Sequence, residues 1–130
     1  MSMSRLIDFN FPLMSGNFEF PIFIGLEESI LESSFFAFNN AIPDSNLDYT
    51  TFELIDKGLD GLGTDVIDYI TNNPDDINNK FVSLSVNKIA IPFIFNKHIQ
   101  KNHVYSLKKT DANASIDCGF SSFVGSERRY

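Results

Sequence analysis

Apolar and polar residues alternate in two runs near the start of the chain. Residues 7–13 place Ile, Phe, Phe and Leu between Asp, Asn and Pro, and residues 18–24 place Phe, Phe, Ile and Ile at every second position. A period of two residues is typical of a strand with one buried face. Residues 14–17, Met-Ser-Gly-Asn, suit a hairpin loop. The sequence therefore predicts an N-terminal β-hairpin.

The middle of the chain has a different spacing. From residue 26 to residue 42 the apolar residues lie three to five positions apart. This spacing favours an amphipathic helix, and the glutamates in its first turns suit the positive end of a helix dipole. Two shorter helices are predicted at residues 49–57 and 65–72, the first ended by Gly58 and the second capped by Thr64.

The period returns to two after a turn-rich segment at residues 72–76. Four further strands are predicted, at residues 82–86, 88–95, 103–109 and 115–123. The second of them is apolar on both faces, which is typical of a central strand. The last residues, 125–130, are expected to form a mobile tail. Strands and helices are segregated along the chain, so the predicted class is α+β, with an N-terminal β-hairpin, three short helices and a largely antiparallel sheet of about four strands.

Length and composition indicate one folded domain over residues 1–130. The chain is 43% hydrophobic and contains 14 phenylalanines, so apolar burial can offset the loss of chain entropy. No apolar run has the length of a membrane span or the unbroken core of a signal peptide. Cys118 is the only cysteine, which excludes an intrachain disulfide. A cytoplasmic location is therefore expected.

Acidic residues are concentrated in the first part of the chain. Residues 1–76 carry 14 acidic and 2 basic side chains, a net charge of −12, whereas residues 77–130 carry 3 acidic and 8 basic side chains, a net charge of +5. An acidic surface repels nucleic acid and anionic lipid, and it speeds the encounter with a basic protein. A cationic protein partner is expected, without nucleic-acid or membrane binding. The alternative is that the charge only keeps a phenylalanine-rich domain soluble.

The segment DKGLDGLGTD, residues 56–65, resembles a calcium-binding loop. An EF-hand loop takes oxygen ligands at positions that include 1, 3 and 5, glycine at position 6 and a bidentate glutamate at position 12. Counted from Asp56, Asp60 and Gly61 fit positions 5 and 6, but position 3 is Gly58 and position 12 is an isoleucine. Because two side-chain ligands are missing, the segment is interpreted as a corner between two helices, with its two leucines packed inward and its aspartates facing outward.

The other residues with reactive side chains form no recognisable motif. His98 and His103 are the only histidines, and no cysteine or nearby carboxylate completes a zinc site, so both are expected in a solvated loop. A catalytic arrangement of either histidine with Asp111, Asp117 or Cys118 stays open, because catalytic groups converge in space. No phosphate-binding, dinucleotide-binding or hydrolase motif is present. No enzymatic activity, cofactor or metal is therefore predicted.

Small size, acidity and the absence of catalytic motifs form a profile that resembles the immunity proteins of bacterial polymorphic and contact-dependent growth inhibition toxin systems. Immunity proteins bind a cognate toxin domain, often a nuclease, and often place acidic side chains opposite its cationic groove. The resemblance implies a cytoplasmic inhibitor that binds a basic toxin domain. The residues that it assigns to this contact are Asp44, Asp48, Glu53, Asp56, Asp60, Asp65, Asp68, Asp75 and Asp76.

Two alternatives follow from the same predicted class. Type III secretion chaperones are also small, acidic and α+β, although they generally begin with a helix; a dimer with exposed hydrophobic grooves would favour this function. A small enzyme with the cone-shaped α+β fold of nuclear-transport-factor-2-like proteins would instead need a deep pocket, lined by His98 or His103 together with a carboxylate.

Overall fold

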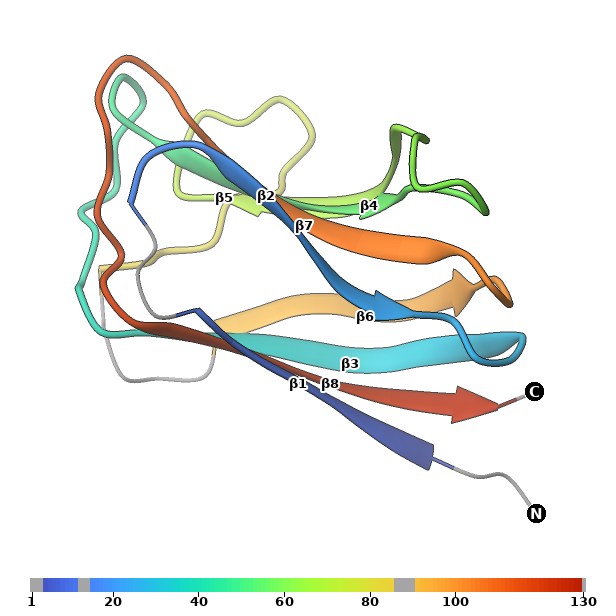
Figure 1. Ribbon diagram of the computed structural model, residues 1–130. Coiled ribbons are helices and arrows are strands. Elements are labelled where there is room, and N and C mark those ends of the chain that lie inside the picture. The colour runs from blue at the N-terminus through green and yellow to red at the C-terminus, as the bar shows by residue number, and fades with distance from the viewer. Residues whose placement is uncertain (1–3, 12–14, 86–90, 130) are drawn as a thin grey trace.

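The chain forms eight β-strands, and it contains no helix in the part that the structure describes (Figure 1). A computed structural model gives residues 4–11, 15–85 and 91–129, with the backbone alone for Ser4 and Phe95. The strands are β1 (Ser4–Phe11), β2 (Phe18–Ile24), β3 (Ser29–Phe38), β4 (Thr50–Asp56), β5 (Asp65–Thr71), β6 (Ile91–Ile99), β7 (Val104–Asp111) and β8 (Ser121–Arg129). The predicted α+β class is wrong, because the fold is all-β.

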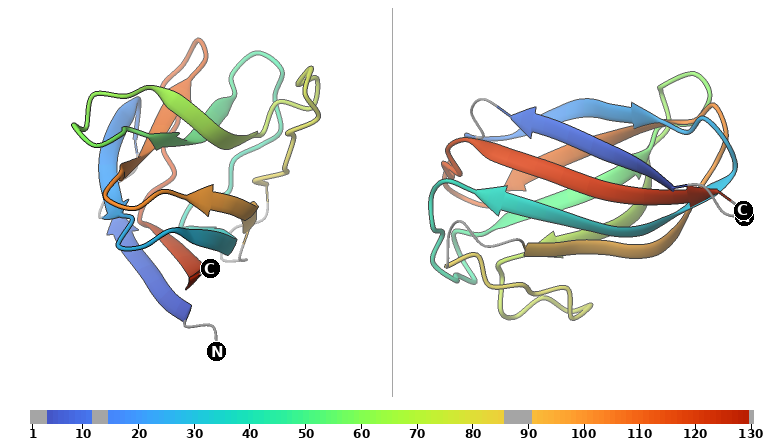
Figure 2. Two further views of the ribbon diagram at one scale, coloured as in Figure 1. Left: turned by 90° about the vertical axis from the view of Figure 1, so that its right-hand side faces the viewer. Right: turned by 90° about the horizontal axis from the view of Figure 1, so that it is seen from below.

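Two antiparallel sheets pack against each other as a sandwich. Sheet I has the strand order β1-β8-β3-β6, and sheet II has the order β2-β7-β4-β5. Figure 2 shows sheet I face-on in its right view and the two layers end-on in its left view. The chain crosses between the sheets at every connection except that from β4 to β5. This strand order is that of a jelly roll, one of the double-sheet solutions for an eight-stranded chain.

Both N-terminal strands form, but the predicted hairpin between them is wrong. β1 pairs with β8 in sheet I, and β2 pairs with β7 in sheet II. The inner faces of β1 and β2 meet across the sandwich instead, where the ring centroids of Phe11 and Phe18 lie 5.8 Å apart. An alternating pattern reports that a strand has one buried face, but it does not identify the strand beside it.

The three predicted helices, at residues 26–42, 49–57 and 65–72, are also wrong, since β3, β4 and β5 occupy these segments. Side chains of β3 alternate between buried and partly exposed, but its register with both neighbours shifts around Ser33. A β-bulge inserts one extra residue at such a point. The buried positions on either side of Ser33, Leu31 and Ser34, are therefore three residues apart. The apolar residues with helix-like spacing come from both faces of this strand, since Ile30 and Phe35 are partly exposed and Phe38 is buried.

The bulged strand also explains an adjacent pair of phenylalanines. Phe35 and Phe36 could not share one face of a helix, but successive side chains of a strand point to opposite faces. Phe36 is fully buried between the sheets, and Phe35 is partly exposed on the outer face of sheet I.

The C-terminal strands are displaced from their predicted positions. β6 covers Ile91–Ile99 and is an edge strand of sheet I rather than a central one, which tolerates the missing N–H of Pro92. The strand predicted at residues 103–109 is confirmed as β7. β8 begins only at Ser121 and includes residues 125–129, which were predicted to be a mobile tail.

The strand predicted at residues 82–86 is wrong over the residues that the structure describes. Residues 81–85 lie in a loop whose only strand-like feature is an isolated bridge between Phe81 and Thr71. Residue 86 and the start of the strand predicted at residues 88–95 lie outside the described residues.

The segment DKGLDGLGTD connects β4 to β5 within one hairpin, so the predicted helical corner is wrong. Asp56 Oδ1 accepts a hydrogen bond from the Gly58 amide at 2.8 Å, and Asp60 Oδ1 accepts one from the Leu62 amide at 2.9 Å. The φ angle of Gly58 is 73°, a value that glycine adopts at little cost. The two leucines, Leu59 and Leu62, are 72% and 78% exposed at the tip of the loop, rather than packed inward.

Aromatic rings fill the centre of the sandwich. The ring of Phe36 has its centroid within 4.9–5.6 Å of the rings of Phe38, Phe52, Phe93 and Phe123. Phe52 belongs to sheet II and the other three belong to sheet I, so this cluster joins the two layers. Burial of such large side chains provides much of the free energy that stabilises a small domain.

A buried ion pair closes one end of the core. Lys109 on β7 is fully buried, and its Nζ donates to both carboxylate oxygens of Asp111 at 2.7 and 2.8 Å. The same ammonium group donates to the carbonyl oxygens of Gly16 at 2.9 Å and Ile116 at 2.8 Å. The ammonium protons all find acceptors, which offsets the cost of removing the charge from water.

Cys118 is expected to be chemically inert in the folded protein. Its thiol is fully buried, and burial raises its pKa to about 12 despite the opposing effect of the Lys109 charge. At pH 8 a thiol with that pKa is about one part in ten thousand thiolate, the reactive form. Titration with a coloured disulfide reagent should therefore show no fast reaction in buffer and one reactive thiol in denaturant. A fast reaction without denaturant would contradict the burial of Cys118.

Candidate functional site

The connections between strands gather at two opposite ends of the sandwich. Residues 39–49, 72–85 and 112–120 lie at one end, here called the loop end, which is on the left in Figure 1. Residues 57–64 and 100–103 lie at the other end, where β1 begins and β8 ends.

The nine acidic residues predicted to contact a partner do not form one surface. Asp44, Asp48, Asp75 and Asp76 lie at the loop end, Asp60 and Asp65 lie at the opposite end, Glu53 lies on the outer face of sheet II, and Asp56 and Asp68 are engaged by internal contacts. The loop end holds three of them with exposed side chains, Asp44, Asp48 and Asp75, and the opposite end holds two.

Asp56 is held inside the fold. Its carboxylate is 5% exposed and contacts Nδ1 of His103 at 2.8 Å and 3.0 Å. The hydroxyl of Tyr105 lies 3.5 Å from the same carboxylate and accepts a hydrogen bond from the Gln100 amide at 2.7 Å. This cluster fixes the end of β4 to the connection between β6 and β7. Asp56 is therefore placed for a structural role, not for contact with a partner.

Asp68 on β5 forms ion pairs at the side of the sandwich where the edge strands β5 and β6 lie next to each other. Its side chain is 13% exposed, with Lys80 Nζ at 2.9 Å and Lys97 Nζ at 3.9 Å. The hydrogen bond to Asp68 raises the pKa of Lys80. Lys97 extends from β6 of the other sheet, so the carboxylate links edge strands of both layers.

Hydrogen bonds hold the loops of the loop end in place. Ser45 Oγ accepts hydrogen bonds from the amides of Leu47 at 3.2 Å and Asp48 at 2.9 Å. Asp75 accepts one from the side chain of Asn46 at 2.8 Å, which joins two of the loops. Because these acceptors already have partners in the free protein, less ordering is needed when another molecule binds.

Three carboxylates share a pocket at this end, here called the acidic pocket. The exposed side chains of Asp44, Asp48 and Asp117 line an open cavity of about 470 Å³. Its remaining lining is largely apolar and includes Ile42 and Ile116. Asp44 also accepts a hydrogen bond from a serine hydroxyl at 2.9 Å. The pocket therefore combines an apolar wall with several negative charges.

Few cations lie near the acidic pocket. Residues 39–49, 72–79 and 111–120 contain no lysine or arginine. Within the described part of the loop end, Lys80 is paired with Asp68 and Lys109 is buried against Asp111. The carboxylates of the pocket thus have no internal ion-pair partner among the described residues.

Sequence reasoning missed Asp117 and the apolar wall of the pocket. Asp117 belongs to the basic part of the chain and is far in sequence from Asp44 and Asp48. Its Oδ1 accepts a hydrogen bond from the Gly119 amide at 2.7 Å, a local turn contact. No local signal could have joined it to the others, because the jelly-roll crossover alone brings the connection before β8 beside the connection before β4.

The residues with catalytic or metal-binding potential do not converge. His98 contacts Glu28 at 2.6 Å and His103 contacts Asp56, both at the end opposite to Asp111, Asp117 and Cys118. No group of three or more histidine, cysteine, aspartate and glutamate residues in the described chain could hold a metal ion. The described histidines therefore form no dyad with the residues considered from the sequence.

No protein-family model, curated protein or solved structure matches this chain. Searching the described residues also finds no helix with the length and apolar character that crossing a membrane requires.

Proposed function

We propose that this protein acts by binding a cationic protein, and that a lysine or arginine of that partner enters the acidic pocket. The observation that carries the proposal is the convergence of Asp44, Asp48 and Asp117 on one cavity with an apolar wall. The stem of a long basic side chain can pack on apolar surface while its charged end remains near carboxylates. Hydrogen bonds between a cation and a carboxylate are about twice as strong as neutral ones.

The proposal extends to an inhibitor of the immunity-protein kind, located in the cytoplasm. Net charge, small size and an acidic site built on fixed loops support a protein that reaches a basic toxin domain quickly and covers it. Both alternatives were drawn from the predicted α+β class, and the all-β fold contradicts that class.

Two charge-matched double variants test the binding site. Asp44→Asn with Asp48→Asn removes two charges from the acidic pocket, and Asp60→Asn with Asp65→Asn removes two charges from the opposite end. Wild-type protein and both variants serve as bait in lysate of the native cell, with the captured proteins identified by mass spectrometry. A basic protein should be captured by the wild type and by the second variant, with binding weakened about tenfold or more in the first.

Salt and growth measurements complete this test. Capture should decline as salt rises from about 0.05 to 0.5 M, because opposite charges on the two surfaces are screened. The captured partner should arrest growth when it is expressed alone, and co-expression of the wild-type chain should restore growth. Equal loss of capture in both double variants would contradict a localised site, and an acidic or neutral partner would contradict the charge argument.

A further inference from the structure

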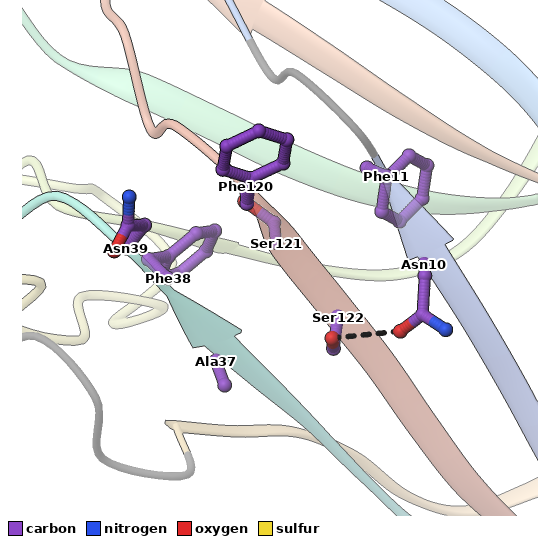
Figure 3. A pocket seen from close by; sticks show the side chains of 8 residues that line it. All are labelled: Asn10, Phe11, Ala37, Phe38, Asn39, Phe120, Ser121 and Ser122. Carbon is purple, nitrogen blue, oxygen red and sulfur yellow. Dashed lines mark hydrogen bonds between the residues drawn. The ribbon is translucent and has the colours of Figure 1, made fainter.

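Sheet I carries an open groove near the loop end. Its volume is about 750 Å³, within the range of roughly 300–1,000 Å³ that small-molecule sites span. Phe11 and Phe38 are among its lining residues, and Figure 3 shows that the lining comes from β1, β3 and β8 and the residues next to them. None of its lining residues takes part in the acidic pocket.

An aromatic ring stands at the groove with most of its surface in water. Phe120 is 66% exposed. Its backbone is fixed, because its carbonyl oxygen accepts a hydrogen bond from the Asn39 amide at 2.9 Å. The preceding Gly119 has a φ angle of 66° and donates to Asp117. Single exposed apolar side chains are common on proteins. Phe120 differs in that it lines a cavity, so its ring is available to a ligand bound there.

Polar groups line the same groove. Ser122 Oγ donates a hydrogen bond to Asn10 Oδ1 at 2.8 Å, and Figure 3 shows the amide nitrogen of Asn10 turned away from Ser122. The Asn10 N–H groups and the lone pairs of Ser122 can then pair with a ligand. Asn39 adds a second amide to the lining. None of the lining residues in the described part of the chain is ionisable.

This combination favours a neutral ligand that carries hydroxyl groups. A charged ligand would find no opposite charge among the described lining residues. A purely apolar ligand would cover the exposed amide of Asn10 without offering it a hydrogen bond, which is unfavourable. A second copy of this chain, with its net charge of −7, would approach close to Asp117 and be repelled.

We propose that the groove binds a neutral saccharide. The less polar face of a pyranose ring would pack on Phe120, whose ring face carries partial negative charge and attracts C–H groups. Its hydroxyls would pair with Asn10 and Ser122, which offer both donors and acceptors. The groove and the acidic pocket share no lining residue, so the chain would hold a protein and a glycan at separate places.

Amide-resolved NMR of the full chain tests the groove with four probes. Lactose, maltose, cellobiose and N,N′-diacetylchitobiose are titrated to about 20 mM, since an open groove is expected to bind with a Kd of about 0.1–10 mM. At least one of them should cause saturable shifts confined to residues 10, 37–39 and 120–122. Absence of such shifts with all four sugars would overturn the proposal.

Three variants assign the effect to the named side chains. Phe120→Ala should weaken binding at least about tenfold, the loss expected when the packing face is removed. Asn10→Ala, which alters an exposed side chain, should also weaken binding and serves as a second reading if Phe120→Ala does not fold. The double variant Asp44→Asn with Asp48→Asn should bind the sugar unchanged. Full binding by Phe120→Ala, or much tighter binding of glucuronate or glucosamine than of the neutral sugars, would contradict the proposed site.

Discussion

Replacement of Lys109 by methionine is expected to lower the free energy of unfolding by about 3–5 kcal/mol, the usual cost of breaking a buried ion pair on one side. The methionine can fill much of the space, but it leaves the Asp111 carboxylate, whose side chain is 4% exposed, without its cation. Urea denaturation followed by circular dichroism measures the change as a lower midpoint at unchanged slope.

Lys108 offers a matched control on the same strand. It is exposed on the outer face of sheet II, opposite Glu53 in the ladder. Lys108→Met should therefore change the free energy of unfolding by less than about 0.5 kcal/mol. Similar losses in the two variants would show that the burial of Lys109 does not determine its contribution.

The Lys109 ion pair also supports the proposed binding site. Asp111 Oδ2 accepts a hydrogen bond from the Ile116 amide at 2.8 Å, and the Ile116 carbonyl receives one from Lys109. Ile116 in turn lines the acidic pocket. The buried charge thus fixes the segment that carries Asp117, and the Lys109→Met variant should lose partner binding even where it remains folded.

Replacement of Phe36 by alanine is the second change with a large expected effect, a loss of about 3–5 kcal/mol in the free energy of unfolding. Its ring is fully buried and contacts aromatic rings from both sheets. A cavity at this point removes dispersion contacts on all sides, because rigid neighbouring strands collapse into it only in part. Urea or thermal denaturation measures the loss.

Leu62→Ala is the comparison for Phe36→Ala. Leu62 is 78% exposed at the tip of the β4–β5 hairpin, so its removal should change stability by less than about 0.5 kcal/mol. A loss below about 1 kcal/mol in Phe36→Ala would mean that the sheets repack without this ring. Such a result would contradict the central position assigned to it.

The local pattern of apolar and polar residues predicted some strands correctly and assigned helices where other strands form. The alternating runs at residues 7–13 and 18–24 gave two correct strands, because the period of buried side chains is a property of the strand itself. The same reasoning failed at β3, where the bulge at Ser33 breaks the alternation and the apolar residues Ile30, Phe35 and Phe38 lie on both faces of the strand. Short apolar runs such as those of β4 and β5 fit either structure, and burial within the sandwich decided between them.

The acidic character of the candidate site could be predicted from the sequence, but the residues that form it could not. Composition alone indicated an acidic surface, and Asp44 and Asp48 were named from the sequence. The structure shows that Asp56 and Asp68 are engaged inside the fold and are not part of the exposed site. It adds Asp117, from the other part of the chain, to the residues that line the acidic pocket. No local rule distinguishes a carboxylate that faces solvent from one that accepts a hydrogen bond inside the fold.

The sequence by itself determined that this chain is rich in phenylalanine, acidic and limited to a single cysteine, because these properties depend on composition. Only the tertiary structure decided which strands are neighbours, since β1 pairs with β8 at the other end of the chain. It also decided which charges are available to a partner. Both depend on contacts between residues distant in sequence, and such contacts are fixed by the packing of the two sheets rather than by local preference.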